Sequence, residues 1–365
     1  MDSVLPEGNI LVSGTMRGGS SLVSNILNSH SKVLILGEYI HFFRFIYKHY
    51  DPLTRRNVEK MLNEMNARLY YRYRVNIDIK SVLEDVDSVG ISYNSIYDAI
   101  MRFYLKKLGK RIAGEDAALG WSTIPEYLRL FPDAKVIQIC RDPRSVLASW
   151  HKASYQKINY LDAIFNCIDN MDKCSYYASL FPKEKYIYVK YEDVINNPEK
   201  EAKRFCELLD VEFEEIMIHP EKWDDMFDGT YVRRGWSSHI GKITKGFDAS
   251  RMGAWKDSLE DWELCLCESL AKDRLEDFGY KLSEKHFTVG DVNRGLDVMR
   301  KSPYLYKRFL NWFTSNQGGE GNPDDPRDPK TWGATGKNKE LFIHTEDGIA
   351  YLKAMEEIKN KYRDG

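Results

Sequence analysis

A glycine-rich turn near the N-terminus carries the residues with the clearest chemical capacity. An apolar run, Ile10–Val12, leads into the stretch Gly14-Thr-Met-Arg-Gly-Gly-Ser-Ser21, and apolar residues then recur at helical spacing over 22–27. A strand, a glycine-rich loop and a helix in this order can hold an anion, because the helix start offers unpaired N–H groups and glycine permits close approach. The stretch therefore predicts a phosphate-binding turn.

This turn differs from an ATP-binding loop at one decisive position. Gly14 and Gly19 have the spacing of G-x-x-x-x-G-K-[ST], but Ser20 stands where the lysine belongs. The nearest cation inside the loop is Arg17. Since a kinase of this type uses the lysine on the phosphates of its nucleotide, the loop argues against ATP chemistry. Taken alone, the pattern also fits a glycine-rich turn without a ligand.

A second anion-binding pattern follows the apolar run 135–140. Arg141 ends this run, Pro143 begins a predicted helix, and Ser149 lies two turns further on. An arginine holds a phosphate with two parallel N–H bonds, and a serine hydroxyl can add a third donor. The same residues would also fit a helix capped by Asp142 with an arginine in a surface ion pair.

Together these patterns resemble the sulfotransferases that use 3′-phosphoadenosine 5′-phosphosulfate (PAPS). The loop of that family reads roughly G-x-x-[KR]-x-G-[ST]-[ST], and its second step reads R-[DN]-P-x-x-x-x-x-S. The step Tyr191-Glu-Asp and the stretch 237–255, which ends in Arg251-Met-Gly-Ala-Trp255, are similar to further family motifs. The matches run from Ile10 to about Gly279, and they are nearer to the bacterial and tyrosylprotein branch than to the branch acting on small phenols.

The resemblance implies a cofactor site and a role for several residues. Arg17 would lie beside the transferring sulfuryl group, Arg141 and Ser149 would hold the 3′-phosphate, and Tyr191 would lie near the adenine. The full implied set for PAPS, and for its product 3′-phosphoadenosine 5′-phosphate (PAP), is Arg17, Gly18, Gly19, Ser20, Ser21, Arg141, Ser149, Tyr191, Ser238, Lys242 and Arg251. No metal is expected, because the leaving group is already a stable bisphosphate.

The resemblance also implies a catalytic base. Sulfuryl transfer needs a group that takes the proton of the acceptor. Glu38 follows the strand-like run that ends at Leu36, and the C-terminal end of a parallel strand faces the ligand site. Enzymes of the tyrosylprotein branch use a glutamate in such a Gly-Glu step as the base. His41 and Asp116 are the alternatives.

One departure from the family pattern concerns positive charge. Many relatives carry a lysine in a G-D-K-T-P-like step before the run 135–140, whereas this chain reads Ala113-Gly-Glu-Asp-Ala-Ala-Leu-Gly-Trp121. Arg17, Lys242 or Arg251 could replace that charge. Reduced activity, or an acceptor that brings its own charge, would be the other consequences.

Composition limits the class of protein. The chain has 365 residues, 43% apolar content and a net charge of −2, which fits a globular enzyme and lacks the basic excess of a nucleic-acid-binding protein. No apolar run approaches the roughly 20 residues of a membrane span. Six cysteines without zinc-site spacing, and an N-terminus without a signal core, favour a cytoplasmic protein with reduced thiols.

Apolar periodicity predicts an α/β fold with a central parallel sheet flanked by helices, in the three-layer, P-loop-like arrangement that the resemblance implies. Four runs are expected to be buried strands: 10–12, 33–36, 135–140 and 186–189. A helical insertion at about 39–112 is expected to cover the acceptor side of a domain spanning 1–284. The extension 285–365, with a loop at about 316–336, could cover the acceptor site or form the contact of a homodimer.

The expected function is transfer of a sulfuryl group from PAPS to a hydroxyl or amine of a small-molecule or natural-product acceptor. Two alternatives remain at this stage. One is a P-loop-type kinase with a degenerate loop. The other is a module that binds PAPS or a bisphosphate without catalysis, which the missing lysine favours.

Overall fold

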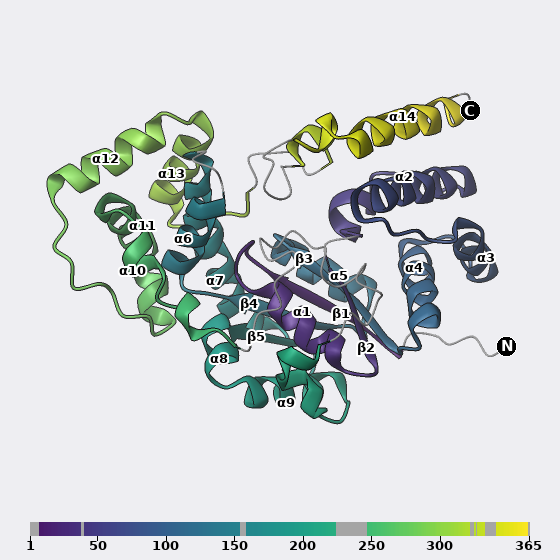
Figure 1. Cartoon of the computed structure of the whole chain (residues 1–365), viewed down its shortest axis with the longest axis horizontal. Coiled ribbons are helices and arrows are strands. Elements are labelled where there is room, and N and C mark those ends of the chain that lie inside the picture. Colours follow the sequence, from purple (N-terminus) through teal and green to yellow (C-terminus); the bar gives the residue numbers. More distant parts are fainter. Residues whose placement is uncertain are drawn as a thin grey trace.

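The centre of the molecule is a sheet of five parallel strands (Figure 1). The computed structural model describes residues 7–37, 40–153, 158–223, 247–321, 325, 327–332 and 341–363. In spatial order the strands are β2 (Val33–Gly37), β3 (Ile112–Ala118), β1 (Gly8–Gly14), β4 (Lys135–Cys140) and β5 (Tyr186–Lys190). All pairs are parallel, so the C-terminal ends of all five strands meet at one edge of the sheet.

The prediction of four strands was incomplete, because β3 was missed. This strand lies between β1 and β2, and its residues Gly114 and Asp116 pair with Ile10 and Val12. Its sequence, Ile-Ala-Gly-Glu-Asp-Ala-Ala, has one β-branched residue, and alanine, glycine and acidic residues are rare in strands. Every residue of β3 is buried, so tertiary packing prevails over local propensity.

The glycine in β3 is required by the close approach of β1. A Cβ atom at Gly114 would lie 1.9 Å from the carbonyl oxygen of Ile10, which is backbone and cannot give way, whereas a Cβ at Gly8 would meet nothing within 4 Å. We therefore expect Gly114→Ala to lower the free energy of unfolding by about 1–3 kcal/mol, as other overpacked sites do. Urea unfolding with Gly8→Ala as control measures this, and equal stability of the two variants would contradict it.

Helices cover both faces of the sheet. Helix α1 (Ser20–Ser29), α8 (Tyr191–Asn196) and α9 (Pro198–Leu209) pack on the face that carries Ile10 and Val12. The opposite face, which carries Leu11, is covered by the segment between β2 and β4 and by α7 (Asp162–Leu180). Figure 1 shows α1 and α9 on one side of the strands and the insertion helices on another. The α/β layer fold predicted from periodicity is thus confirmed.

The segment between β2 and β3 is helical, as expected. It begins with a short π-helix, Phe42–Ile46, and continues as α2 (Arg55–Tyr73), α3 (Ile79–Val89) and α4 (Tyr93–Leu108). The side chains of Thr54, Asp78 and Ser92 cap the three α-helices, which explains where each begins. Four aromatic residues of this segment are buried in the core: Phe42, Tyr73, Tyr97 and Tyr104.

Between β3 and β5 the chain adds the helices that flank the site. The short 3-10 turn Trp121–Thr123 and α5 (Ile124–Leu130) follow β3, and α6 (Pro143–Ala153) follows β4. A further short helical turn, Ile158–Leu161, precedes α7. Since α6 and α8 both begin where a strand ends, their N-termini lie at the C-terminal edge of the sheet, where open parallel sheets bind ligands.

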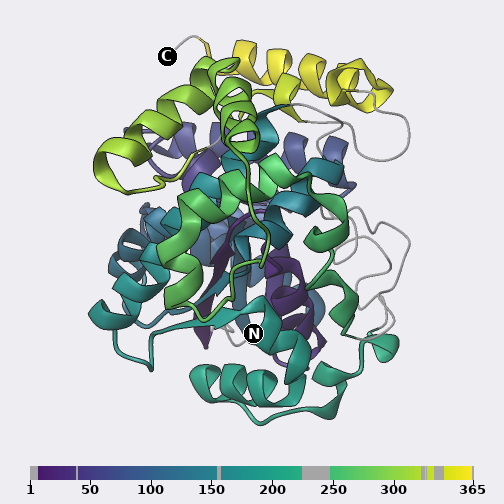
Figure 2. The ribbon, with the colours of Figure 1, turned by 90° about the vertical axis from the view of Figure 1, so that its left-hand side faces the viewer.

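The C-terminal part of the chain contacts both sides of the molecule. Helices α10 (Trp255–Ser258), α11 (Asp261–Asp277), α12 (Val289–Arg300) and α13 (Pro303–Ser315) gather beside α6 and α7. Helix α14 (Glu346–Lys361) instead packs along α2, as Figures 1 and 2 show. An ion pair between Arg74 and Asp347 and a ring contact between Tyr71 and Tyr351 join α2 to α14. No helix of the described residues is long and apolar enough to cross a bilayer.

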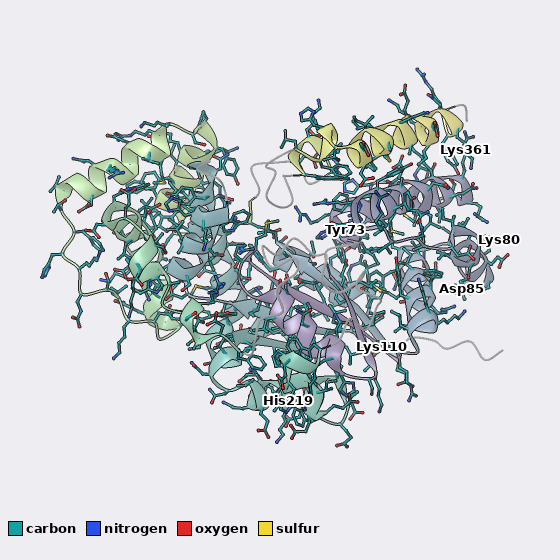
Figure 3. The ribbon with its side chains drawn as sticks, in the orientation of Figure 1. Tyr73, Lys80, Asp85, Lys110, His219 and Lys361 are labelled. Atoms are coloured by element: carbon teal, nitrogen blue, oxygen red, sulfur yellow. The ribbon has the colours of Figure 1, made fainter. Side chains whose placement is uncertain are left out.

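A buried lysine fixes the end of α1. Lys110 (Figure 3) precedes β3, and its Nζ donates hydrogen bonds to the carbonyls of Asn28, His30 and Val33 at 2.6–2.8 Å. Burial lowers the pKa of this ammonium group to about 8. The contacts tie the C-terminus of α1 to the start of β3, and they hold the helix that begins at the glycine-rich turn.

Candidate active site

The glycine-rich turn adopts the geometry that its sequence predicts. β1 ends at Gly14 and α1 begins at Ser20, with Gly19 at the N-cap in a left-handed conformation of φ 108°. A Cβ at Gly19 would lie 2.4 Å from Cδ2 of Tyr191, and one at Gly18 would lie 2.7 Å from the carbonyl oxygen of Thr15. No side chain of the described residues caps this helix, so its first N–H groups face the loop without a side-chain acceptor.

Two of the cofactor residues implied from distant motifs meet at this turn. Arg17, itself at φ 66°, donates from Nε to the Ser149 hydroxyl at 2.9 Å, although the two residues are 132 positions apart. Arg141 donates from Nη1 to the carbonyl oxygen of Arg17 at 3.0 Å. The loop after β1, the residue that follows β4 and the second half of α6 therefore meet at one cationic site.

Arg141 joins this turn to two further segments. Its Nη2 donates to the carbonyl oxygen of Arg251 at 3.0 Å, and its guanidinium carbon lies 4.0 Å above the ring centre of Tyr191. Only 9% of Arg141 is exposed, and its buried Nε has no hydrogen-bond partner in the described part of the chain. A guanidinium has five N–H donors, so donors remain for an anion after both carbonyls are satisfied.

The other cofactor residues implied by the resemblance differ in their burial and in their contacts. Ser20 is buried at the helix start, whereas Ser21 is exposed. Tyr191 is the first residue of α8 and packs against Gly19, and burial raises its pKa. Arg251 offers the site its carbonyl group, while its half-exposed side chain pairs with Asp248 at 3.4 Å. Ser238 and Lys242 lie outside the described residues.

The predicted base, Glu38, also lies outside the described residues. The residue before it, Gly37, ends β2 at the C-terminal edge of the sheet and pairs with Asp116 of β3. The described chain resumes at Ile40, which is buried. The position of Glu38 in the sequence thus follows a strand end at the edge that carries the glycine-rich turn.

The two alternative bases are both buried. His41, in a left-handed conformation of φ 48°, is 7% exposed, and burial together with Arg44, Arg68 and Arg72 holds its pKa well below the usual value. Its imidazole is therefore neutral at physiological pH. Asp116 is 2% exposed within β3, on the sheet face that packs against α1.

A buried charge network behind Arg141 was not found from the sequence. Asp142 and Glu268 both pair with Arg144, at 2.8 and 2.7 Å, and Arg144 is 3% exposed. Glu192 accepts hydrogen bonds from the backbone N–H of Asp142 and from the hydroxyl of Tyr280. These contacts fix the strand-to-helix turn that presents Arg141. The second arginine of Arg-Asp-Pro-Arg was the signal available in the sequence.

The part of the chain that carries the five-stranded sheet matches a known protein family. The Sulfotransferase family model matches residues 9–215, more than half of the chain. The chain belongs to the sulfotransferase family. Among the residues that the structure describes, no cluster of three or more histidine, cysteine or acidic side chains could hold a metal ion.

Individual relatives of this sulfotransferase are distant. A curated Caenorhabditis briggsae protein, "Putative protein-tyrosine sulfotransferase", is 26% identical over 146 residues, which cover 37% of this chain and 51% of that protein. The chain thus spans about half the length of that relative. The sulfotransferase domain from the curacin biosynthetic pathway aligns with a TM-score of 0.50 at 18% identity, covering 76% of this chain and 99% of that domain. The sulfotransferase domain of the Synechococcus PCC 7002 olefin synthase gives 0.52 at 18% identity, covering 78% and 98%. These two structures show the fold.

Proposed function

We propose that this sulfotransferase moves a sulfuryl group from PAPS to a hydroxyl or amine of a small-molecule acceptor. The observation that carries the proposal is the meeting of Arg17, Arg141 and Ser149 at the start of α1. Two guanidinium groups, a hydroxyl and a helix N-terminus make a site for more than one anionic group. PAPS carries two such groups, the 5′-phosphosulfate and the 3′-phosphate.

The residues present fit this cofactor. The close packing of Gly18 and Gly19 leaves no room for larger side chains, so the loop backbone is free to approach a 5′-phosphosulfate. Arg141, whose buried Nε has no hydrogen-bond partner among the residues that the structure describes, and Ser149 are assigned to the 3′-phosphate. The ring of Tyr191, stacked under Arg141, is assigned to the adenine side. Bound PAPS would supply the activated sulfuryl group.

The protein residues would then perform two tasks. Glu38 would take the proton from the acceptor as its oxygen or nitrogen attacks, a role that typically contributes 10²–10⁴-fold. Arg17 would stabilise the negative charge that develops where the bond to the leaving phosphate breaks. For this task Arg17 would exchange its hydrogen bond with Ser149 for one to the reacting group.

The base assignment predicts a specific loss of turnover. We expect Glu38→Gln to lower kcat by about 100-fold or more, because the amide cannot accept the proton, while PAP binding stays unchanged. Transfer of label from sulfur-labelled PAPS to a panel of hydroxyl and amine acceptors measures kcat, and calorimetry measures PAP binding. Asp116→Asn tests the alternative base Asp116, and this variant should keep its activity if Glu38 is the base. Full activity of Glu38→Gln would overturn the assignment.

One observation favours a second candidate function. Where many relatives carry a lysine, the chain has the buried acidic residues Glu115 and Asp116 within β3. A site that lacks this cation could bind a bisphosphate without catalysing transfer. PAP binding by wild-type protein, with no label transfer to any acceptor, would support this candidate.

A further inference from the structure

Two buried charged side chains from different elements hold the same short piece of backbone. Glu115 of β3 accepts a hydrogen bond at Oε2 from the N–H of Phe42, at 3.1 Å. Arg68 of α2 donates from Nη2 to the carbonyl oxygen of Ile40, at 2.8 Å. The backbone of residues 40–42 is therefore held at a carbonyl by one charged group and at an N–H by the other.

Both side chains are deeply buried at this position. Glu115 is 1% exposed on the sheet face that carries Leu36, its neighbour on β2, and Arg68 is 3% exposed. The guanidinium of Arg68 lies 4.0 Å above the ring centre of Phe45. Within the described part of the chain neither group belongs to an ion pair of 4 Å or less, the contact that usually offsets the cost of burying a charge.

The same region contains further unsatisfied groups. The Oε1 atom of Glu115, Nη1 of Arg68 and Nδ1 of His41 are buried and have no hydrogen-bond partner among the described residues. His41 also has a left-handed backbone conformation, which is costly for a residue other than glycine. Buried unsatisfied groups are rare in folded proteins. Their concentration around residue 41 marks a segment whose conformation is held at a cost, as at functional sites.

We propose that Glu115 and Arg68 are positioning residues for turnover, because they fix the backbone of residues 40–42, which follow the proposed base Glu38 in the sequence. The proposal rests on the proposed function, in which Glu38 is the base. The segment they hold begins two residues after Glu38, and Gly37 before it is fixed by pairing with β3. A displacement of about 1 Å at a reacting group can cost 100-fold in rate, so the conformation of this short connection matters for turnover.

Protonation of Glu115 would weaken this hold. Burial raises the pKa of Glu115 to about 7, while the N–H groups of Phe42 and His41 and the charge of Arg68 oppose that rise. Burial and the nearby charge of Glu115 both raise the pKa of the Tyr97 and Tyr127 hydroxyls. At a pH below this pKa the carboxyl group is mostly neutral, and it accepts the hydrogen bond from the N–H of Phe42 more weakly. The contact with Phe42 is thus progressively weakened as the pH decreases through about 7, and kcat should fall over the same range.

The test compares Glu115→Gln with Asp98→Asn in the full chain. Asp98 is a partly buried carboxyl group with a raised pKa, bonded to Asn9 near the start of β1, away from the site. We expect Glu115→Gln to lower kcat by about 10- to 100-fold, with PAP affinity unchanged and without the fall in kcat near pH 7. Amide hydrogen exchange of His41 and Phe42 should accelerate. Asp98→Asn should change none of these.

The outcomes separate a positioning role from a structural one. Faster exchange at residues 41 and 42 with an unchanged kcat and pH profile would show that Glu115 only stabilises the fold, and would overturn the proposal. If Glu115→Gln does not fold, Arg68→Lys is used, which keeps the charge but loses the planar fork, and the same fall in kcat is expected. Full activity of Glu38→Gln would instead remove the base assignment itself.

Discussion

Arg17→Ala is expected to lower kcat by about 100- to 1000-fold, the usual cost of removing a donor that stabilises developing charge. Arg17 is the cation of the glycine-rich turn, and its backbone and side chain are held by Arg141 and Ser149. In the alanine variant neither Arg141 nor Ser149 supplies a positive charge at the position of the Arg17 side chain. Affinity for PAP, which lacks the sulfuryl group, should fall much less than kcat. Initial rates of label transfer from PAPS and calorimetric titration with PAP measure the two effects.

Two further variants show whether charge or shape is responsible. Arg17→Lys keeps the charge but cannot donate from an Nε to Ser149, so it should retain more activity than the alanine variant. Ser149→Ala removes the partner of Arg17 and should weaken PAP binding through the lost 3′-phosphate hydroxyl contact. A kcat of Arg17→Ala within threefold of wild type would contradict the role assigned to this residue.

Arg141→Ala is expected to weaken PAP binding by about 30-fold or more, because truncating a buried charged partner typically costs 2–5 kcal/mol. This variant loses the hydrogen bonds from Arg141 to the carbonyl oxygens of Arg17 and Arg251. It also loses the contact of the guanidinium group with the ring of Tyr191. Adenosine 5′-phosphate lacks the 3′-phosphate, so it cannot lose a contact between Arg141 and that group. A lower affinity for this nucleotide would therefore report a change in the structure of the loop. Its affinity should change much less than that of PAP.

A surface arginine provides the control for this experiment. Arg55 is 45% exposed and pairs with Asp87 at 2.9 Å between α2 and α3. Arg55→Ala should leave both affinities unchanged, since exposed ion pairs contribute little. Equal losses of affinity for PAP and adenosine 5′-phosphate in Arg141→Ala would show that Arg141 supports the loop rather than the 3′-phosphate.

The strands that the sequence identified are those rich in branched apolar residues. Runs such as Ile-Leu-Val in β1 and Val-Ile-Gln-Ile in β4 are typical of buried parallel strands, and β2 and β5 contain similar runs. β3 contains Gly114 and two buried acidic residues instead. Its position is decided by the space beside β1 and by the hydrogen bond of Glu115 with Phe42, neither of which is local in sequence.

In the candidate site, too, the residues of local motifs could be predicted, whereas the residues with distant partners could not. The turn around Gly19 and the step from Arg141 to Ser149 are each contiguous in sequence, so each could be compared with a family motif, and the resemblance implied that the two share one cofactor site. The roles of Arg68, Glu115 and Arg144 depend on partners 28, 73 and 124 residues away, which spacing cannot show. Periodicity describes one element at a time, whereas these contacts are made between elements.

The measurement that tests the account most directly is calorimetric titration of the wild-type protein with PAP, compared with ATP and magnesium. A site with Ser20 in place of the ATP-loop lysine, and with Arg141 and Ser149 beside Arg17, should bind PAP at micromolar concentration and ATP far more weakly. Preference for ATP with magnesium, or no binding of PAP, would contradict the assignment of PAPS as the sulfuryl donor.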